Sequence, residues 1–69
     1  MSIDDVLAGL AVEKKRIAMA DEMARRVGVP QHRAHIYLAM EKVAAKKYDR
    51  DIDMTRVAWA IKFDSEGKR

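Results

Sequence analysis

Two histidines, His32 and His35, lie three positions apart, so a helix would bring them close enough to share a metal ion. A zinc site needs at least a third ligand, usually another histidine, a cysteine or a carboxylate. The chain has no cysteine, and no other ligand stands nearby on the same predicted helix face. The sequence therefore predicts two exposed polar histidines, with no metal and no cofactor.

Three aspartates at alternate positions, Asp49, Asp51 and Asp53, match the opening of a calcium-binding loop. That loop also requires a glycine at its sixth position and a glutamate at its twelfth. This chain has Met54 and Ala60 at those places. The pattern instead predicts an acidic turn that caps a following helix.

Hydroxyl groups that could act as a nucleophile are few, and such a group needs an activating base beside it. Ser2 and Ser65 lie near the chain ends, and Thr55 and the two tyrosines have no evident base. The sequence also lacks a glycine-rich phosphate loop. We expect no enzymatic activity.

Helices must position these residues, because apolar side chains recur at intervals of three and four along most of the chain. In the first segment Ser2 is a good N-cap, and Met1 and Val6 stand where a hydrophobic staple would join them. The helical stripe that follows consists of Ile3, Val6, Leu10, Ile17, Ala20, Ala24 and Val27.

This first segment is predicted to end near Val27. Gly9 and the charged run 13–16 could bend it, so the segment is one long helix or two collinear helices. Gly28 is suited to the left-handed position that ends a helix, and Pro30 to the first position of the next. A second helix is then expected from Pro30 to about Lys47.

A third helix is predicted after the N-cap Asp53, ending near Phe63, with Ile52 and Val57 placed as a staple. Residues 55–63 also alternate as a strand would, and such a strand could pair only across a dimer. Residues 64–69 are expected to form a frayed polar tail. The predicted fold is all-α, a single small domain over residues 1–69 with three helices, or four if the first is broken.

Residues 20–39 resemble the helix-turn-helix of small phage-type regulators, through Ala24, Gly28, Val29, Ala34 and Tyr37. The resemblance implies that the second helix is a recognition helix that enters the major groove of DNA. Of its outward residues only Gln31 has the amide or cationic group that reads bases directly, while Arg33 would lie towards the rim. The other outward residues would be His32, His35, Ile36 and Ala39.

The second helix has apolar residues on two sides, one with Ala34, Tyr37, Ala44 and Tyr48, the other with Ile36, Ala39, Met40 and Val43. A helix that is apolar on two sides is buried on two sides, so one side needs another chain. We therefore expect a protein partner on this side, which could also form the homodimer that the small size and hydrophobic composition of the chain predict. The predicted partner-binding residues are Gln31, His32, Arg33, His35, Ile36, Ala39, Met40 and Val43.

Composition limits the remaining possibilities. The chain has 69 residues, 49% of them hydrophobic, and a net charge of +3 from 14 basic and 11 acidic side chains. This balance permits DNA binding without requiring it. With neither a basic leader nor a membrane span evident, we expect a cytoplasmic protein.

We predict a non-enzymatic regulatory protein of the phage or plasmid type that binds and inhibits a host protein, such as a transcription regulator. The alternative is a helix-turn-helix DNA-binding repressor.

Overall fold

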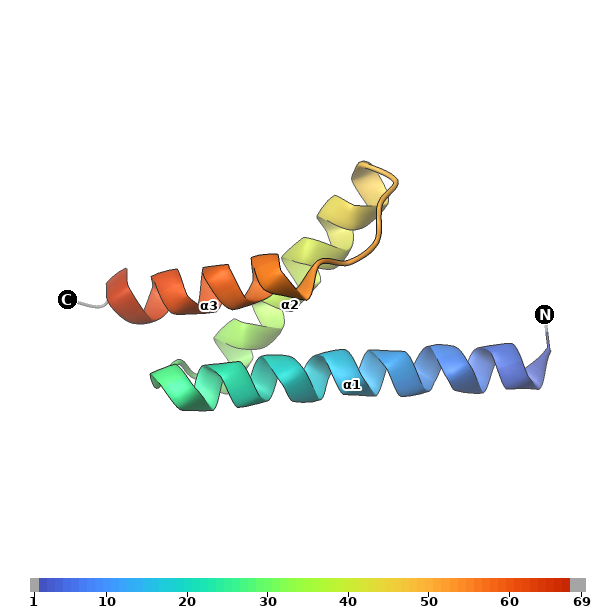
Figure 1. The fold of residues 1–69 in the computed structure, drawn as a ribbon, viewed down its shortest axis with the longest axis horizontal. Coiled ribbons are helices and arrows are strands. Elements are labelled where there is room, and N and C mark those ends of the chain that lie inside the picture. Colours follow the sequence, from blue (N-terminus) through green and yellow to red (C-terminus); the bar gives the residue numbers. More distant parts are fainter. Residues whose placement is uncertain (1, 68–69) are drawn as a thin grey trace.

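The computed structural model describes residues 2–67, which form helices joined by short turns and links and contain no strand. The helices are α1 (Ile3–Val27), α2 (Gln31–Lys47) and α3 (Met54–Gly67). Figure 1 shows α1 and α3 side by side and running in the same direction, with α2 crossing behind them. Each helix contacts the other two. The predicted all-helical fold is confirmed, with helix rather than strand over residues 55–63.

The first helix is continuous, so neither Gly9 nor the charged run 13–16 breaks it. Its N-cap is Ser2, whose hydroxyl accepts a hydrogen bond of 3.2 Å from the backbone N–H three residues later. At its other end Gly28 has a φ of 76°, in the left-handed region that favours glycine. Both predicted helix ends are therefore confirmed.

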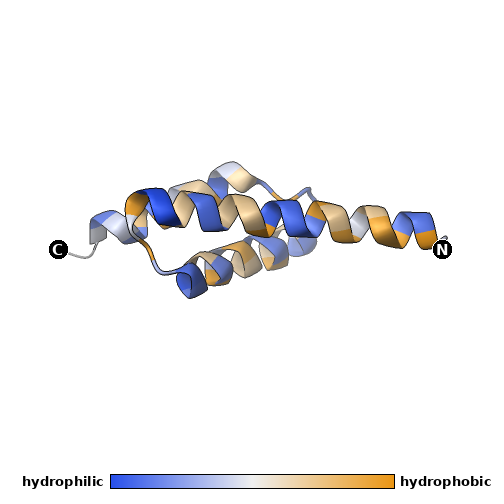
Figure 2. Ribbon diagram, turned by 90° about the horizontal axis from the view of Figure 1, so that it is seen from below, coloured by the Kyte–Doolittle hydropathy of each residue, from blue (hydrophilic) through white to orange (hydrophobic). Residues whose placement is uncertain are grey.

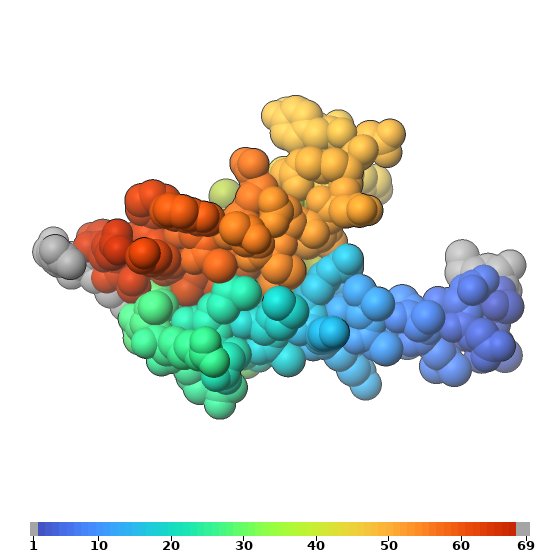
Figure 3. All heavy atoms as spheres, in the orientation of Figure 1, coloured from blue at the N-terminus to red at the C-terminus, as the bar shows by residue number. Residues whose placement is uncertain are grey.

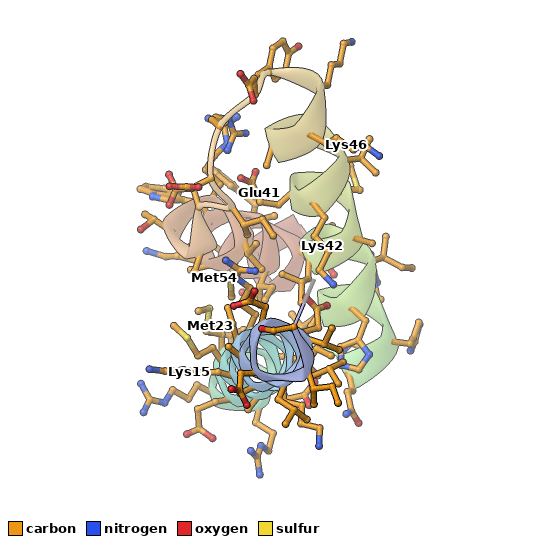
Figure 4. The ribbon with its side chains drawn as sticks, turned by 90° about the vertical axis from the view of Figure 1, so that its right-hand side faces the viewer. Lys15, Met23, Glu41, Lys42, Lys46 and Met54 are labelled. Carbon is orange, nitrogen blue, oxygen red and sulfur yellow. The ribbon has the colours of Figure 1, made fainter. Side chains whose placement is uncertain are left out.

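The core is small and lies where the three helices meet. Its most enclosed side chains include Ala20, Ala24 and Ala34, each at most 1% exposed. Such short side chains allow helices to approach closely. Met23 of α1 and Met54 of α3 lie between their two helices and pack against the core (Figure 4). The other buried residues of the core cluster are Val29, Leu38, Val57 and Ile61.

The first part of α1 contacts neither of the other helices closely, so Ile3, Val6 and Leu10 of the predicted helical stripe are not buried. All residues from 2 to 12 are exposed. The reason is that α2 diverges from α1 and α3 begins only alongside its middle (Figure 1). We call residues 3–12 the arm; Figure 3 shows it projecting from the rest of the molecule. The staple predicted between Met1 and Val6 lies outside the described residues.

The side of α2 that faces the core is also rotated relative to the prediction. Tyr37 and Ala44 are only half-buried, and Tyr48 is exposed. The rotation turns a carboxylate, Glu41, inward, which the sequence pattern disfavoured because a buried charge needs a partner. The buried residues of α2 are Ala34, Leu38, Glu41 and Ala45.

Between α2 and α3 the chain turns through Asp49, whose φ of 52° is in the left-handed region. The backbone N–H of Arg50 then donates to the carbonyl of Ala45 at 2.9 Å, which closes the end of α2. The Asp53 carboxylate accepts the backbone N–H of Thr55 at 2.9 Å. The predicted capping role of Asp53 is thereby confirmed.

Two predicted helix boundaries need correction. Pro30 precedes α2 as its N-cap, with φ −59° and ψ 143°, and is not the first helical residue. The third helix continues to Gly67 and does not end near Phe63, so residues 64–67 are helical and not a tail. The Asp64 carboxylate, which the sequence placed in that tail, is buried against Arg33 of α2. Residues 68–69 of the expected tail lie outside the described part.

Candidate functional site

The side of α2 opposite the core carries four aliphatic residues, Ile36, Ala39, Met40 and Val43. Their spacing of i, i+3, i+4 and i+7 places them on one face of the helix. All four are exposed, and Ile36, Met40 and Val43 keep 53%, 61% and 69% of their surface in contact with solvent. We call these four residues the outer strip.

The outer strip lines a shallow apolar groove that continues to the C-terminal end of α2. Lys47 and Tyr48 form that end, and the Lys47 Nζ lies 5.5 Å from the centre of the Tyr48 ring. Figure 4 looks along α1 and shows α2 upright, with side chains extending from it away from the other two helices. The groove is thus a continuous apolar surface on the free side of α2.

The polar candidates at the start of α2 are mostly held by α1. A single carboxylate, that of Asp21, accepts a hydrogen bond of 3.1 Å from the side-chain amide of Gln31. Its other oxygen lies 2.7 Å from Nε2 of His35. Only His32 of this group is exposed without a bond to another described residue. Gln31 and His35 therefore act as ties between the two helices.

Arg33 is held in the same way by α3. Its guanidinium lies 2.7 Å from Oδ1 of Asp64, whose side chain is 6% exposed. The other carboxylate oxygen of Asp64 is buried and has no partner among the described residues. The eight predicted partner-binding residues thus divide into an exposed apolar set and a polar set that, apart from His32, is bonded internally.

Glu41 is a buried charged residue that the sequence did not identify. Its carboxylate accepts bonds from the Arg50 guanidinium at 2.5 and 3.3 Å and from the Asp53 backbone N–H at 2.9 Å, while Arg56 lies 3.4 Å away. The hydrogen bonds from Arg50 and Asp53 lower the pKa of Glu41 from its ordinary 4.5 to about 2. The only advance signal was an acid in register with Ala34, Leu38 and Ala45. This network fixes the α2–α3 link behind the outer strip.

A second exposed feature absent from the predicted site is an aromatic pair on α3. The rings of Trp59 and Phe63 lie 5.5 Å apart between centroids, and both side chains are more than half exposed. Lys62 lies over the Trp59 ring at 5.8 Å. In the sequence, the four-residue spacing of these two aromatics is the signal that places them on one face of a helix.

Two other geometric features bear on the predicted chemistry. Over residues 2–67, no three His, Cys, Asp or Glu side chains converge as metal ligands would. None of the helices described is both long enough and apolar enough to span a bilayer.

Comparison with protein-family models, with curated proteins and with solved structures finds no match for this chain. Of the residues that carry the resemblance, Ala24, Val29 and Ala34 are buried, Tyr37 is half-buried, and Gly28 forms the turn. The resemblance of residues 20–39 to a helix-turn-helix therefore rests on these residues alone.

Proposed function

We propose that this protein is a small non-enzymatic regulator that binds another protein through the outer strip of α2 and inhibits it. The observation that carries the proposal is the exposure of four aliphatic side chains on the side of α2 that the core leaves free. Helices that dock in grooves of other proteins use anchors at this i, i+3, i+4, i+7 spacing. Ile36, Met40 and Val43 are the proposed anchors.

The charges of α2 indicate the chemistry of the partner surface. The only acid in α2 is Glu41, which is buried and bonded to Arg50. The exposed charged residues near the strip, Lys46 and Lys47, are positive. Complementary potentials favour the correct partner and speed encounter. We therefore expect an apolar patch with an acidic rim on the partner.

DNA binding is the second candidate, supported by those same positive charges. Base reading needs free amide or guanidinium groups. Gln31 and Arg33 are engaged with Asp21 and Asp64, and the centre of the outer face is aliphatic. These contacts favour the protein partner over DNA.

We also propose that the protein is a homodimer. Its core is confined to the junction of three helices, while the arm and the outer strip both leave apolar side chains in water. Small domains of this kind often gain stability by association. Sedimentation at micromolar concentration tests the oligomeric state directly.

The partner class is tested by affinity capture from a lysate of the source organism, with and without nuclease. The bait proteins are the wild type, Ile36→Asp and the control Val12→Asp. Val12 is an exposed aliphatic residue of α1 and not part of the strip. We expect the wild type and the control to retain the same protein after nuclease treatment, and Ile36→Asp to lose it. Buried anchors commonly account for most of the binding energy.

A different outcome would favour DNA. Binding to a duplex that survives Ile36→Asp, weakens with Lys46→Ala and falls steeply between low and moderate salt would contradict the proposal, because such salt dependence reports phosphate contacts.

A further inference from the structure

The arm of α1 is an apolar helix that the rest of the chain does not cover. Ile3, Val6, Leu7 and Leu10 lie along one side of it and are between 46% and 77% exposed. Figure 2 shows hydrophobic residues along this projecting part of the helix. Contiguous apolar surface that a chain leaves in water commonly marks an interaction site. The arm therefore offers a surface against which another helix can pack.

The charges at the two ends of the arm have opposite signs. Asp4 and Asp5 stand in its first turn; after its last residue come Glu13, which pairs with Lys42 of α2, and then the bases Lys14, Lys15 and Arg16. Asp4 and Lys14 are ten residues apart, about 15 Å along a helix, so they cannot pair within one chain. Neither the two first-turn acids nor the three bases form an ion pair with another described residue. The acids that do form ion pairs are Glu13, Asp21, Glu22, Glu41 and Asp64.

The angular positions of these charges make the arm complementary to itself. At 100° per residue, Asp4 lies on one edge of the apolar side and Lys14 lies between that edge and the centre, whereas Asp5 and Arg16 lie on the opposite side of the helix, near Val12. Two antiparallel helices related by a two-fold axis bring matching edges together. Asp4 then approaches Lys14 of the other chain. This pairing places the centre of the contact close to Gly9 and its neighbour Leu10.

From this complementarity we infer that the arm binds the arm of a second copy of this chain, antiparallel, centred near Gly9 and Leu10. Gly9 supports this register. A glycine inside a helix weakens that helix, and a Cβ built at Gly9 would meet nothing within 4 Å in the single chain. With Ala11 on the opposite edge, it leaves both edges small at the crossing point, where two helices come closest.

The outer strip of α2 does not have this property. Pairing α2 with itself would bring Lys46 and Lys47 towards His32 and Arg33 of the other copy, with no exposed acid in either helix. Like charges across an interface oppose association. The inference thus deepens the proposed homodimer and is independent of the partner proposed for α2.

The test measures the dimer dissociation constant by sedimentation equilibrium for the full chain and three variants. Leu7→Asp alters the apolar side, Val12→Asp alters the opposite side of the same arm, and Ile36→Asp alters the outer strip. We expect Leu7→Asp to raise the dissociation constant at least roughly a hundredfold, because the two-fold axis counts each change twice. The two other variants should stay within about threefold of the wild type.

Charge reversal tests the register. Asp4→Lys should weaken the dimer by roughly tenfold, and the double variant Asp4→Lys/Lys14→Asp should restore it, since the exchanged charges again meet across the axis. Because the chain has no cysteine, Leu10→Cys under mild oxidation should form a disulfide-linked dimer and Val12→Cys should not.

Three results would overturn the inference. These are a wild-type monomer up to 100 micromolar, a dimer that Ile36→Asp disrupts and Leu7→Asp leaves intact, and a charge exchange that fails to restore the dimer weakened by Asp4→Lys. Circular dichroism of every variant confirms that the helices are retained. Loss of partner capture by Ile36→Asp is a separate readout, so failure of one proposal leaves the other standing.

Discussion

The arm of α1 and the outer strip of α2 are both exposed, apolar and helical, but they differ in charge and in support. The arm has two exposed acids in its first turn and three bases beyond the paired Glu13 at its other end, whereas α2 exposes no acid at all. Behind the strip lie the core and the Glu41 network; behind the arm lies solvent. The order of charges along a helix thus separates a surface suited to its own copy from one suited to a different partner.

The outer strip has the core packed behind it and the arm does not. This difference should have its largest effect on amide hydrogen exchange. In the Leu7→Asp variant, amides in the arm should exchange at least about a hundredfold faster than those around Leu38 in α2, because nothing but the helix itself protects them. In the wild type at dimer-forming concentration the arm should gain protection. Equal protection of the arm amides and the amides around Leu38 in the Leu7→Asp variant would contradict this prediction. It would show that the arm helix is stable without a packed neighbour.

Glu41→Gln should weaken the support of the outer strip. The change removes the charge that binds Arg50 and the N–H of Asp53 while preserving the shape of the side chain. Hydrogen bonds to charged groups contribute roughly 1.5–3 kcal/mol, and Arg50 can partly recover hydration, so we expect a loss of about 2 kcal/mol in the free energy of unfolding. Urea unfolding measures it, with the exposed Glu66→Gln as control.

The same network predicts a dependence of stability on pH. The pKa of Glu41 is lowered from 4.5 to about 2, so the folded protein resists a proton that the unfolded chain accepts near pH 4.5. This stabilisation is complete above pH 4.5 and is lost as the pH falls towards 2. The difference in urea midpoint between wild type and Glu41→Gln should therefore shrink from about pH 6 to about pH 2.5. A constant difference would mean that the charge of Glu41 is irrelevant.

Gly28→Ala should destabilise the fold by about 1 kcal/mol or more, because alanine is strained at a φ of 76°. Gly28 fixes the direction of α2 relative to α1. The loss of stability should therefore affect the three-helix body, residues 13–67, and not the arm. Thermal unfolding gives the stability, and sedimentation below the new midpoint should give an unchanged dimer. Gly9→Ala is the matched control, because it should strengthen the helix and alter only the arm.

The smallest effect is expected at the end of the strip. Asp49 has a φ of 52°, and its negative charge follows the negative end of α2. Asp49→Gly removes the backbone strain and the unfavourable charge. We expect the free energy of unfolding to rise by about 0.5 kcal/mol, after allowing for the greater freedom of glycine in the unfolded chain. Chemical unfolding can resolve this change. A loss of stability would indicate that the Asp49 carboxylate makes a useful contact.

Short-range features of this fold could be predicted from the sequence. Ser2, Gly28 and Asp53 cap helices through backbone groups within a few residues of themselves. Their capping roles can therefore be predicted from the local sequence. For the same reason the outer strip, defined by spacing within one helix, was identified in advance as a face that the core does not use.

Features that depend on where another helix lies could not be predicted. Asp64 looked like part of a polar tail because Arg33 is far away in sequence. The sequence did not identify the buried Glu41, because its partner, Arg50, lies beyond the end of α2. The exposure of the arm was not predictable either, because its apolar spacing is the same whether or not α2 and α3 reach it. All three features depend on how far one helix lies from another. The spacing of apolar residues within a helix gives no information about that distance.

The continuity of α1 through Gly9 has a mechanical consequence. Twenty-five residues make a rod of about 37 Å, and its rigidity fixes where the body sits relative to the arm. If two copies join by their arms, the two outer strips are carried at a set separation on opposite ends of the assembly. Such a dimer is bivalent: a target with two copies of the binding patch at that separation would be held far more tightly than a target with one. Inserting residues into α1 between the arm and the body would then change avidity without touching a single contact residue.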